Sequence, residues 1–263
     1  MNWLQSIIYG FVSGLTEFIP VSSRGHQAIL LELFGQSSSN PILDILVHSA
    51  VLIAIYFSQK SIRSSVTSSR TAHSITGPLD RRFVKSAVIP MLVGILLLTY
   101  LTKANRSLLF VSVVTFINGL ILFVPGRMLR GNKDARSMST LDGILVGLLA
   151  TLSAFPGISR VGAVVSCACA RGAHRHSALN WALSLSFPAI CMWLLIDVFH
   201  LFTTFQPVDF LSVVYYLLAA VSAYAGTYLG IRFVRIVTAR VGFSAFAYYS
   251  WGAALFAFIL YLI

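Results

Sequence analysis

Residues 13–26 read SGLTEFIPVSSRGH, a polar stretch inside a chain that otherwise consists mostly of apolar residues. Proline and glycine within the stretch prevent one continuous helix. It also holds side chains that are costly to place in an apolar environment: Glu17, Ser22, Ser23, Arg24 and His26. The explanation of why the apolar sequence is interrupted here leads to the fold of the whole chain.

The composition identifies the class of protein. The chain has 263 residues, of which 57% are hydrophobic and 10% are charged, and its mean hydropathy is +0.83. Soluble domains carry about 25% charged residues, so we expect an all-α polytopic membrane protein. The net charge of +11 then indicates which loops are cytoplasmic, and no nucleic-acid partner is expected. Three cysteines in apolar or small-residue context are expected to be buried structural thiols: Cys167, Cys169 and Cys191.

Six segments of about 20 mostly apolar residues are long enough to cross a bilayer: 42–58, 84–102, 107–126, 178–199, 211–231 and 243–263. Two further segments, 3–34 and 141–171, are apolar overall but carry proline, glycine and polar residues at their middle. Each half of these segments is too short to span. We therefore predict two re-entrant helix–loop–helix hairpins. Their loops should line a cavity, because irregular backbone at membrane depth must be covered by protein or water.

The distribution of lysine and arginine supports this map, because cytoplasmic loops are enriched in both. With two hairpins and six spans, most of the 19 Lys and Arg residues fall on one side of the membrane. The opposite side keeps only Lys103 and Arg106, and Arg24 and Arg160 lie inside the broken segments. The basic loops are therefore predicted to be cytoplasmic. One of them, the Ser/Thr/Arg-rich segment 58–82, is predicted to be a mobile loop.

The map contains an inverted repeat. Residues 1–128 and 140–263 each hold one hairpin and three spans, and three crossings leave the second half upside down relative to the first. The breaks share the pattern P-x-x-S-R, which starts at Pro20 and at Pro156. In inverted repeats the binding site lies where broken helices converge, so we expect one site made by both hairpins.

The residues at the breaks suit a phosphate or diphosphate. Half-helix N-termini carry unpaired N–H groups and a partial positive charge, and Arg24 and Arg160 add guanidinium groups that match phosphate oxygens. Glu17 would repel an anion, so we expect it to hold a divalent cation, Mg²⁺ or Ca²⁺, or to transfer a proton. His26 is a candidate nucleophile or general acid–base.

Two motifs carry a family resemblance. GLTEFIPVSSRGH (14–26) resembles the GLTEFLPISSTGH motif of the BacA/UppP undecaprenyl-diphosphate phosphatases, and PGISRVG (156–162) resembles their PGTSRSG motif. The resemblance implies six spans with two re-entrant hairpins. It implies hydrolysis of the terminal phosphate of undecaprenyl diphosphate at the outer face of the bacterial plasma membrane, which recycles the lipid carrier for the cell wall and underlies bacitracin resistance.

The same resemblance assigns site residues by position: catalysis by Glu17, Ser23 and His26, with Glu17 also a metal ligand, and phosphate binding by Ser159 and Arg160, to which the neighbouring Ser22 and Arg24 are added. The choice of nucleophile between Ser23 and His26 stays open. The expected partners are a polyprenyl diphosphate, membrane lipids and, in a homodimer, a second copy of the chain.

This chain departs from the family pattern at four polar positions. Ser13 stands where the family has an acid or amide, Arg24 where it has threonine, Val161 where it has serine, and Ala150 where glutamine is common. The departures shift the charge of the site in the positive direction. They keep open an alternative function, a lipid-phosphate carrier or flippase of the same fold with weak or no catalysis.

A second phosphatase class is excluded by spacing. The phosphatidic-acid phosphatase superfamily has an S-R-x5-H motif, and no histidine follows Ser159 and Arg160 at that distance. Other histidines and acids have simpler interpretations. His48 is interpreted as a hydrogen-bonded core histidine and Asp197 as a residue that reaches the membrane surface. Histidines 174 and 176 are interpreted as solvated side chains at the membrane interface.

Overall fold

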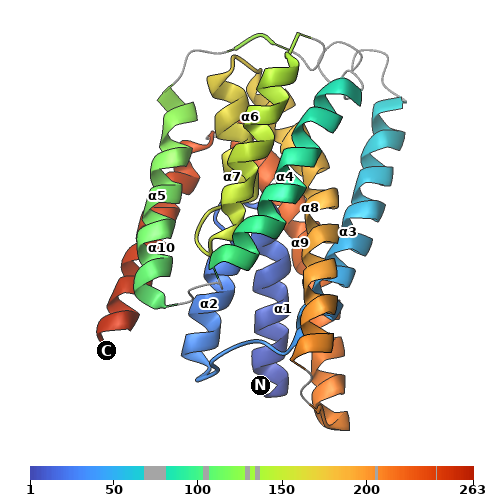
Figure 1. Cartoon of the computed structure of the whole chain (residues 1–263), viewed down its shortest axis with the longest axis vertical. Coiled ribbons are helices and arrows are strands. Elements are labelled where there is room, and N and C mark those ends of the chain that lie inside the picture. Colours follow the sequence, from blue (N-terminus) through green and yellow to red (C-terminus); the bar gives the residue numbers. More distant parts are fainter. Residues whose placement is uncertain (68–80, 103–106, 128–130, 134–136, 205–206, 241) are drawn as a thin grey trace.

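The computed structural model describes residues 1–67, 81–102, 107–127, 131–133, 137–204, 207–240 and 242–263. Within these ranges the regular structure is helical, apart from one isolated bridge between Lys133 and Ala173. Six helices are long and apolar enough to cross a membrane: α3 (Pro41–Thr67), α4 (Arg81–Thr102), α5 (Leu108–Arg127), α8 (Arg175–Thr203), α9 (Phe210–Arg240) and α10 (Ser244–Leu262). The six predicted spans are thus confirmed as membrane-length helices, and Figure 1 shows that they form one bundle.

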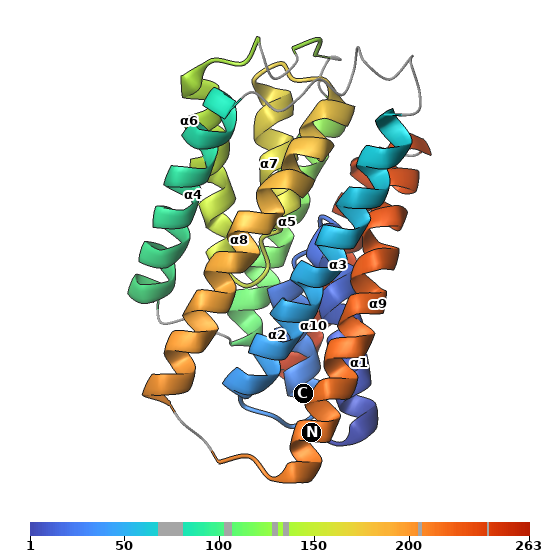
Figure 2. The same ribbon diagram turned by 90° about the vertical axis from the view of Figure 1, so that its right-hand side faces the viewer.

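Both broken segments form two short helices, as predicted. The first consists of α1 (Trp3–Phe18) and α2 (Ser23–Leu33), and the second of α6 (Thr140–Thr151), which continues into the 3₁₀ turn η2 (Leu152–Ala154), and α7 (Arg160–Ala170). Figures 1 and 2 show α1 and α2 at one end of the bundle and α6 and α7 at the other, with their turns facing each other near the middle.

Local chemistry explains where these short helices begin and end. Ile19, the C-cap of α1, has an extended backbone, as expected for a residue before proline. α2 starts at the N-cap Ser22, whose side chain accepts a hydrogen bond from the Gly25 N–H, and α7 starts at the N-cap Ser159, whose side chain accepts from the Gly162 N–H. The P-x-x-S-R pattern is therefore a helix stop followed by a helix start.

Close backbone contacts hold the first helix of each pair against a long helix. A Cβ added at Gly14 in α1 would overlap the carbonyl oxygen of Ala223 in α9. A Cβ added at Gly147 in α6 would likewise overlap the carbonyl oxygen of Ala87 in α4. Small residues permit this approach, which is a common basis of helix packing in membranes. The first helix of each pair, α1 or α6, therefore packs tightly on a long helix that comes from the other half of the chain.

The basic residues mark one end of the bundle. α4 begins at Arg81, α5 ends at Arg127, α8 begins at Arg175 and α9 ends at Arg240, and Figure 1 places these helix termini together at the top. We call this the basic end. The predicted exceptions on the other side, residues 103 and 106, lie outside the described residues.

One predicted boundary is wrong. The segment 58–82 was expected to be a loop, but α3 continues to Thr67 and α4 begins at Arg81. Once a helix has formed, each added residue loses its backbone freedom but gains one hydrogen bond. A helix therefore readily extends past its apolar part. Residues 68–80 of the predicted mobile loop lie outside the described residues.

Candidate active site at the junction of the two helix breaks

The two helix breaks are joined by two direct hydrogen bonds and by one bridging side chain. The Gly157 N–H donates to Ser22 Oγ over 3.0 Å, and Arg24 Nη1 donates to the Ala154 carbonyl oxygen over 2.9 Å. The side chain of Asn118 in α5 joins the same breaks, since it donates to the carbonyl of residue 20 and accepts from the N–H of residue 159. The sequence pattern that suggested convergence therefore corresponds to direct contact between the two breaks.

Ser22 adopts a backbone conformation unusual for its type. Its φ is +68°, and among the described residues it is the only non-glycine with a positive φ. Such residues cost free energy and persist where the surrounding structure fixes them. In this conformation Ser22 Oγ accepts from both Gly25 N–H and Gly157 N–H. The strain therefore keeps one hydroxyl at the N-terminus of α2 and against the opposite break.

Glu17 and Arg160 form a buried ion pair across the junction. Arg160 Nη2 donates to Glu17 Oε1 over 2.9 Å, and the side chain of Arg160 is only 4% exposed and that of Glu17 10%. Arg160 Nε also donates to Ser186 Oγ in α8 over 3.3 Å. A buried charge needs such a partner to avoid a large desolvation cost. The guanidinium predicted to bind phosphate is therefore held by the carboxylate predicted to do the chemistry.

A small cavity, which we call the inner cavity, lies at this pair. Its volume is about 30 Å³, which is the share of liquid volume that one water molecule takes. Six of the predicted site residues line it: Glu17, Ser22, Ser23, Arg24, Ser159 and Arg160. A cavity of this size is too small for a diphosphate as it stands.

His26 is the predicted site residue that does not line the inner cavity. Its Nδ1–H donates to the Ser22 carbonyl oxygen over 2.8 Å, and its Nε2 lies 2.8 Å from the hydroxyl of Tyr249 in α10. The two rings also stack, with centroids 5.7 Å apart. The structure thus directs His26 toward α10 and connects it to the cavity only through the backbone of Ser22.

A larger cavity of about 430 Å³, the outer cavity, shares Arg24, His48 and Trp193 with the inner one. Its wall includes Tyr100 near the end of α4 and His200 near the end of α8. These helix ends lie at the end of the bundle opposite the basic end, as Figure 2 shows. A ligand that enters from this end therefore meets Arg24, whose guanidinium lies 4.1 Å from the Trp193 ring centroid, before it meets Glu17 and Arg160.

Sequence reasoning missed the role of two of these residues. His48 Nδ1 in α3 donates to Asp197 Oδ2 in α8 over 2.5 Å, and His48 lines both cavities. The prediction that His48 is hydrogen-bonded is confirmed, and its partner Asp197 is 9% exposed, a pairing that the sequence did not indicate. The sequence did contain one indication of their importance, because both are ionisable residues inside a span and such residues are usually functional.

The structure limits how a metal ion could be held. Among the described residues, no group of three or more His, Cys, Asp or Glu side chains is placed to bind one. Glu17 is the one carboxylate that lines the inner cavity. These residues fit a cation that takes a single ligand from the protein and the others from phosphate oxygens and water, an arrangement common for Mg²⁺.

Comparison with known proteins now gives the family. The family model described as "Bacitracin resistance protein BacA" matches residues 6–256. The chain belongs to the BacA family. The match covers nearly the whole chain and includes both helix breaks.

Curated relatives in the BacA family carry a consistent name. The undecaprenyl-diphosphatase of Carboxydothermus hydrogenoformans is 28% identical over 251 residues, which cover 95% of this chain and 94% of that protein. Undecaprenyl-diphosphatase 3 of Bacillus cereus is 25% identical over 263 residues, covering 99% and 98%. The undecaprenyl-diphosphatase of Idiomarina loihiensis is 28% identical over 218 residues, covering 81% and 82%. This chain is similar to all three along most of its length.

Ser13, which the sequence comparison interpreted as a changed motif position, holds two hydrogen bonds. Its carbonyl oxygen accepts from Ser23 Oγ over 3.0 Å, and its hydroxyl accepts from Gln27 Nε2 over 3.1 Å. Ser13 is 2% exposed and does not line either cavity. In this BacA protein the position therefore fastens α1 to α2.

Proposed function

We propose that the protein is an undecaprenyl-diphosphate phosphatase that removes the terminal phosphate of the lipid carrier and so recycles it for cell-wall synthesis, with bacitracin resistance as a consequence. The observation that carries the proposal is the meeting of Glu17, Ser23 and Arg160 at one cavity between the N-termini of α2 and α7. The names of the relatives support the same substrate.

The membrane arrangement is part of the proposal. We take α1–α2 and α6–α7 as re-entrant hairpins that enter from opposite faces, and residues 1–128 and 140–263 as inverted repeats. Reciprocal packing supports this: α1 packs on α9 of the second half, and α6 packs on α4 of the first. With the basic end in the cytoplasm, the outer cavity opens at the outer face of a bacterial plasma membrane, where a diphosphate released by polymer export would be found.

Substrate entry exchanges partners within the site. The terminal phosphate approaches Arg24 first and then competes with Glu17 for Arg160, because a guanidinium binds phosphate oxygens at least as well as a carboxylate. The N-termini of α2 and α7 add N–H groups and partial positive charge. Binding therefore opens the Glu17–Arg160 pair and enlarges the inner cavity.

The released Glu17 carboxylate is the group placed to accept the proton of the attacking hydroxyl, either of Ser23 or of a water molecule. The Ser23 hydroxyl donates to the Ser13 carbonyl in this structure, and Ser23 lines the cavity whereas His26 does not. We therefore favour Ser23 over His26 as nucleophile: its Oγ bonds to the terminal phosphorus while the bond from that phosphorus to the bridging oxygen breaks, so that undecaprenyl phosphate leaves, and water then hydrolyses the phosphoserine to release phosphate. We assign His26 to orienting the turn at Ser22. A divalent cation held by Glu17 and the phosphate oxygens would supply charge neutralisation.

A carrier or flippase for lipid phosphates is the second candidate. The observation that favours it is the small inner cavity with a single carboxylate. Purified protein incubated with C55 diphosphate, with and without Mg²⁺ or Ca²⁺, separates the two functions by phosphate release. Hydrolysis that is lost in Glu17→Gln supports the phosphatase. Absence of hydrolysis, together with transfer of labelled lipid phosphate across proteoliposomes, supports the carrier.

A further inference from the structure

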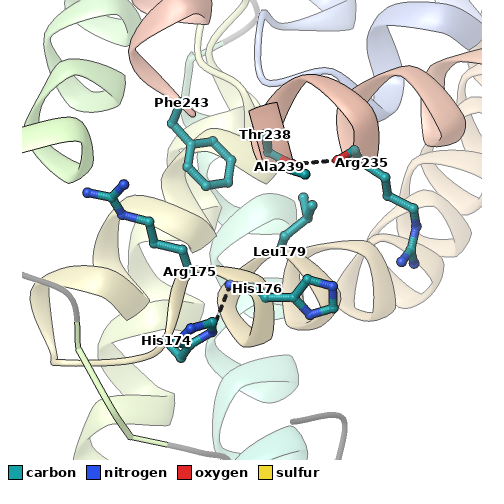
Figure 3. A pocket seen from close by; sticks show the side chains of 8 residues that line it. All are labelled: His174, Arg175, His176, Leu179, Arg235, Thr238, Ala239 and Phe243. Atoms are coloured by element: carbon teal, nitrogen blue, oxygen red, sulfur yellow. Dashed lines mark hydrogen bonds between the residues drawn. The ribbon is translucent and has the colours of Figure 1, made fainter. Parts of the chain in front are cut away.

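A cavity of about 300 Å³ lies at the basic end of the bundle, between the start of α8 and the end of α9. It shares no lining residue with the inner or outer cavity. Figure 3 shows its wall, which holds four basic side chains and no acidic one: His174, Arg175, His176 and Arg235. We call this cavity the basic pocket.

Arg235 is the residue that points most directly to a ligand. Its Nε atom is buried and has no hydrogen-bond partner among the described residues. An unpaired buried donor is destabilising, and a small rotation of the Arg235 side chain would let an anion in the pocket accept from it. Arg232, one turn earlier in α9, differs, because its guanidinium lies 4.5 Å from the Tyr228 ring centroid.

The start of α8 adds positive character. His174 is the N-cap of α8, and its Nδ1 accepts from the His176 N–H over 3.3 Å, as the dashed line in Figure 3 shows. The first turn of a helix carries a partial positive charge and unpaired N–H groups. Arg175 Nη2 donates to the Pro125 carbonyl oxygen in α5 over 3.0 Å, and Figure 3 shows this guanidinium directed away from Arg235, so Arg175 contributes charge at the rim and no direct contact.

Apolar surface completes the basic pocket. Leu179 and Phe243 form part of its wall, and Phe243 is 3% exposed. The basic end lies where the long apolar helices end, which is the level of lipid head groups if these helices span a bilayer. Basic pockets between helices at such a level bind anionic head groups.

We infer that the basic pocket binds a phosphate-bearing anion, through Arg235 and the start of α8, and that this site is separate from the active site. The same chemistry could come from the head group of an anionic lipid or from free phosphate. Both present oxygens with negative charge to the unpaired Arg235 donor, and only the lipid also has chains to lie along the apolar wall.

The test must remove phosphate binding at the active site, so it uses the full chain with Arg160→Ala. Binding is measured by native mass spectrometry with short-chain phosphatidylglycerol, with inorganic phosphate, and with phosphatidylcholine as the zwitterionic lipid. A second substitution, Arg235→Gln, should weaken binding about tenfold to a hundredfold, the effect of losing a charge-assisted hydrogen bond. The matched control Arg232→Gln, on the same helix, should leave binding unchanged.

The outcomes identify the ligand. Tight binding of phosphatidylglycerol alone assigns the pocket to a lipid head group, and binding of inorganic phosphate assigns it to free phosphate. Thermal unfolding of each variant shows that the fold is retained. Equal binding by the Arg235→Gln and Arg232→Gln proteins, equal binding of phosphatidylcholine and phosphatidylglycerol, or no binding of either anion by the Arg160→Ala protein would overturn the inference. None of these results depends on hydrolysis.

Discussion

Glu17 and Arg160 lie 143 residues apart in sequence and 2.9 Å apart in space, each at the break of a different helix pair. Both side chains line the small inner cavity, and in this structure the charge of each is neutralised by the other. The charge that would repel a phosphate and the charge that would attract it are therefore balanced until a ligand separates them. This relationship makes substitutions of either residue informative about both binding and folding.

Glu17→Gln keeps the shape of the side chain and removes its charge. If Glu17 accepts the proton during hydrolysis, kcat should fall by about 10²–10⁴. Because Arg160 then loses its counter-charge and becomes free to bind phosphate, the affinity for diphosphate should not decrease. Phosphate release and lipid binding measured on the same preparation test both parts. A variant with unchanged kcat would remove Glu17 from the chemistry.

His26 and Tyr249 form a matched pair for separating catalysis from positioning. Tyr249→Phe removes the hydroxyl at His26 Nε2, while His26→Asn removes the ring that holds the Ser22 carbonyl. If His26 only orients the turn, His26→Asn should lower kcat by about tenfold, and Tyr249→Phe should have less effect. A loss of 10³ or more in His26→Asn, with a changed pH profile of kcat, would instead assign His26 to proton transfer or nucleophilic attack.

The His48–Asp197 pair gives a third prediction. Asp197→Asn removes the charge that orients the His48 ring at the two cavities. A carboxylate that fixes a histidine tautomer contributes to catalysis when that histidine handles protons. We expect kcat to fall at least tenfold while the affinity for diphosphate changes little. A double-mutant cycle with His48→Gln should show non-additive effects; additive effects would mean that the two residues act independently.

Asp142 predicts a pH dependence of stability. Burial alone would raise its pKa, but hydrogen bonds from Ser139 and from Arg171, whose Nε lies 2.5 Å from Oδ1, hold the pKa of Asp142 below its ordinary value. A lowered folded-state pKa stabilises the protein above the unfolded pKa of about 3.9, and this contribution is lost as the pH falls through the folded pKa. Asp142→Asn should therefore cost on the order of 1 kcal/mol at pH 7.

The measurement for Asp142 is thermal unfolding of wild type and Asp142→Asn in the same detergent across pH 3 to 8. The difference in unfolding midpoint should be constant near neutral pH and shrink below about pH 4. A difference that grows in acid would contradict the stated direction of the pKa shift.

Topology gives the last prediction. Asn132 lies at the basic end, and Thr204 follows α8 at the opposite end and is exposed. In a variant without native cysteines, a cysteine at position 132 should react with an impermeant label only from the cytoplasm, and one at position 204 only from outside. Labelling of position 204 from the cytoplasm would reverse the proposed face of the active site.

The sequence was sufficient to predict the features that repeat or that depend on local chemistry. The apolar lengths predicted the six long helices, and the proline of each P-x-x-S-R pattern predicted where the short helices break. The shared pattern also predicted that the breaks at Pro20 and Pro156 meet. These features depend on spacing and backbone chemistry, which a single sequence displays.

Features that depend on which helix packs beside which were not predictable in the same way. His26 contacts Tyr249 because α5 packs against both α2 and α10, and Asp197 meets His48 because α3 packs on α8. Asn118, whose amide bridges both breaks, is marked in the sequence only as a polar residue in an otherwise apolar span. An ionisable or amide residue inside a span indicates that a polar partner exists, but the sequence does not show on which helix that partner lies.

The glycine contacts determine how the molecule can open. Since Gly14 leaves no space for a methyl group between α1 and α9, and Gly147 leaves none between α6 and α4, each of these pairs should move as one rigid body. Glu17 belongs to the first body, whereas Arg160 begins α7, which follows α6 in the second. Admission of a lipid diphosphate between Glu17 and Arg160 should therefore move these two bodies relative to each other, and each body contains one helix from either half of the chain.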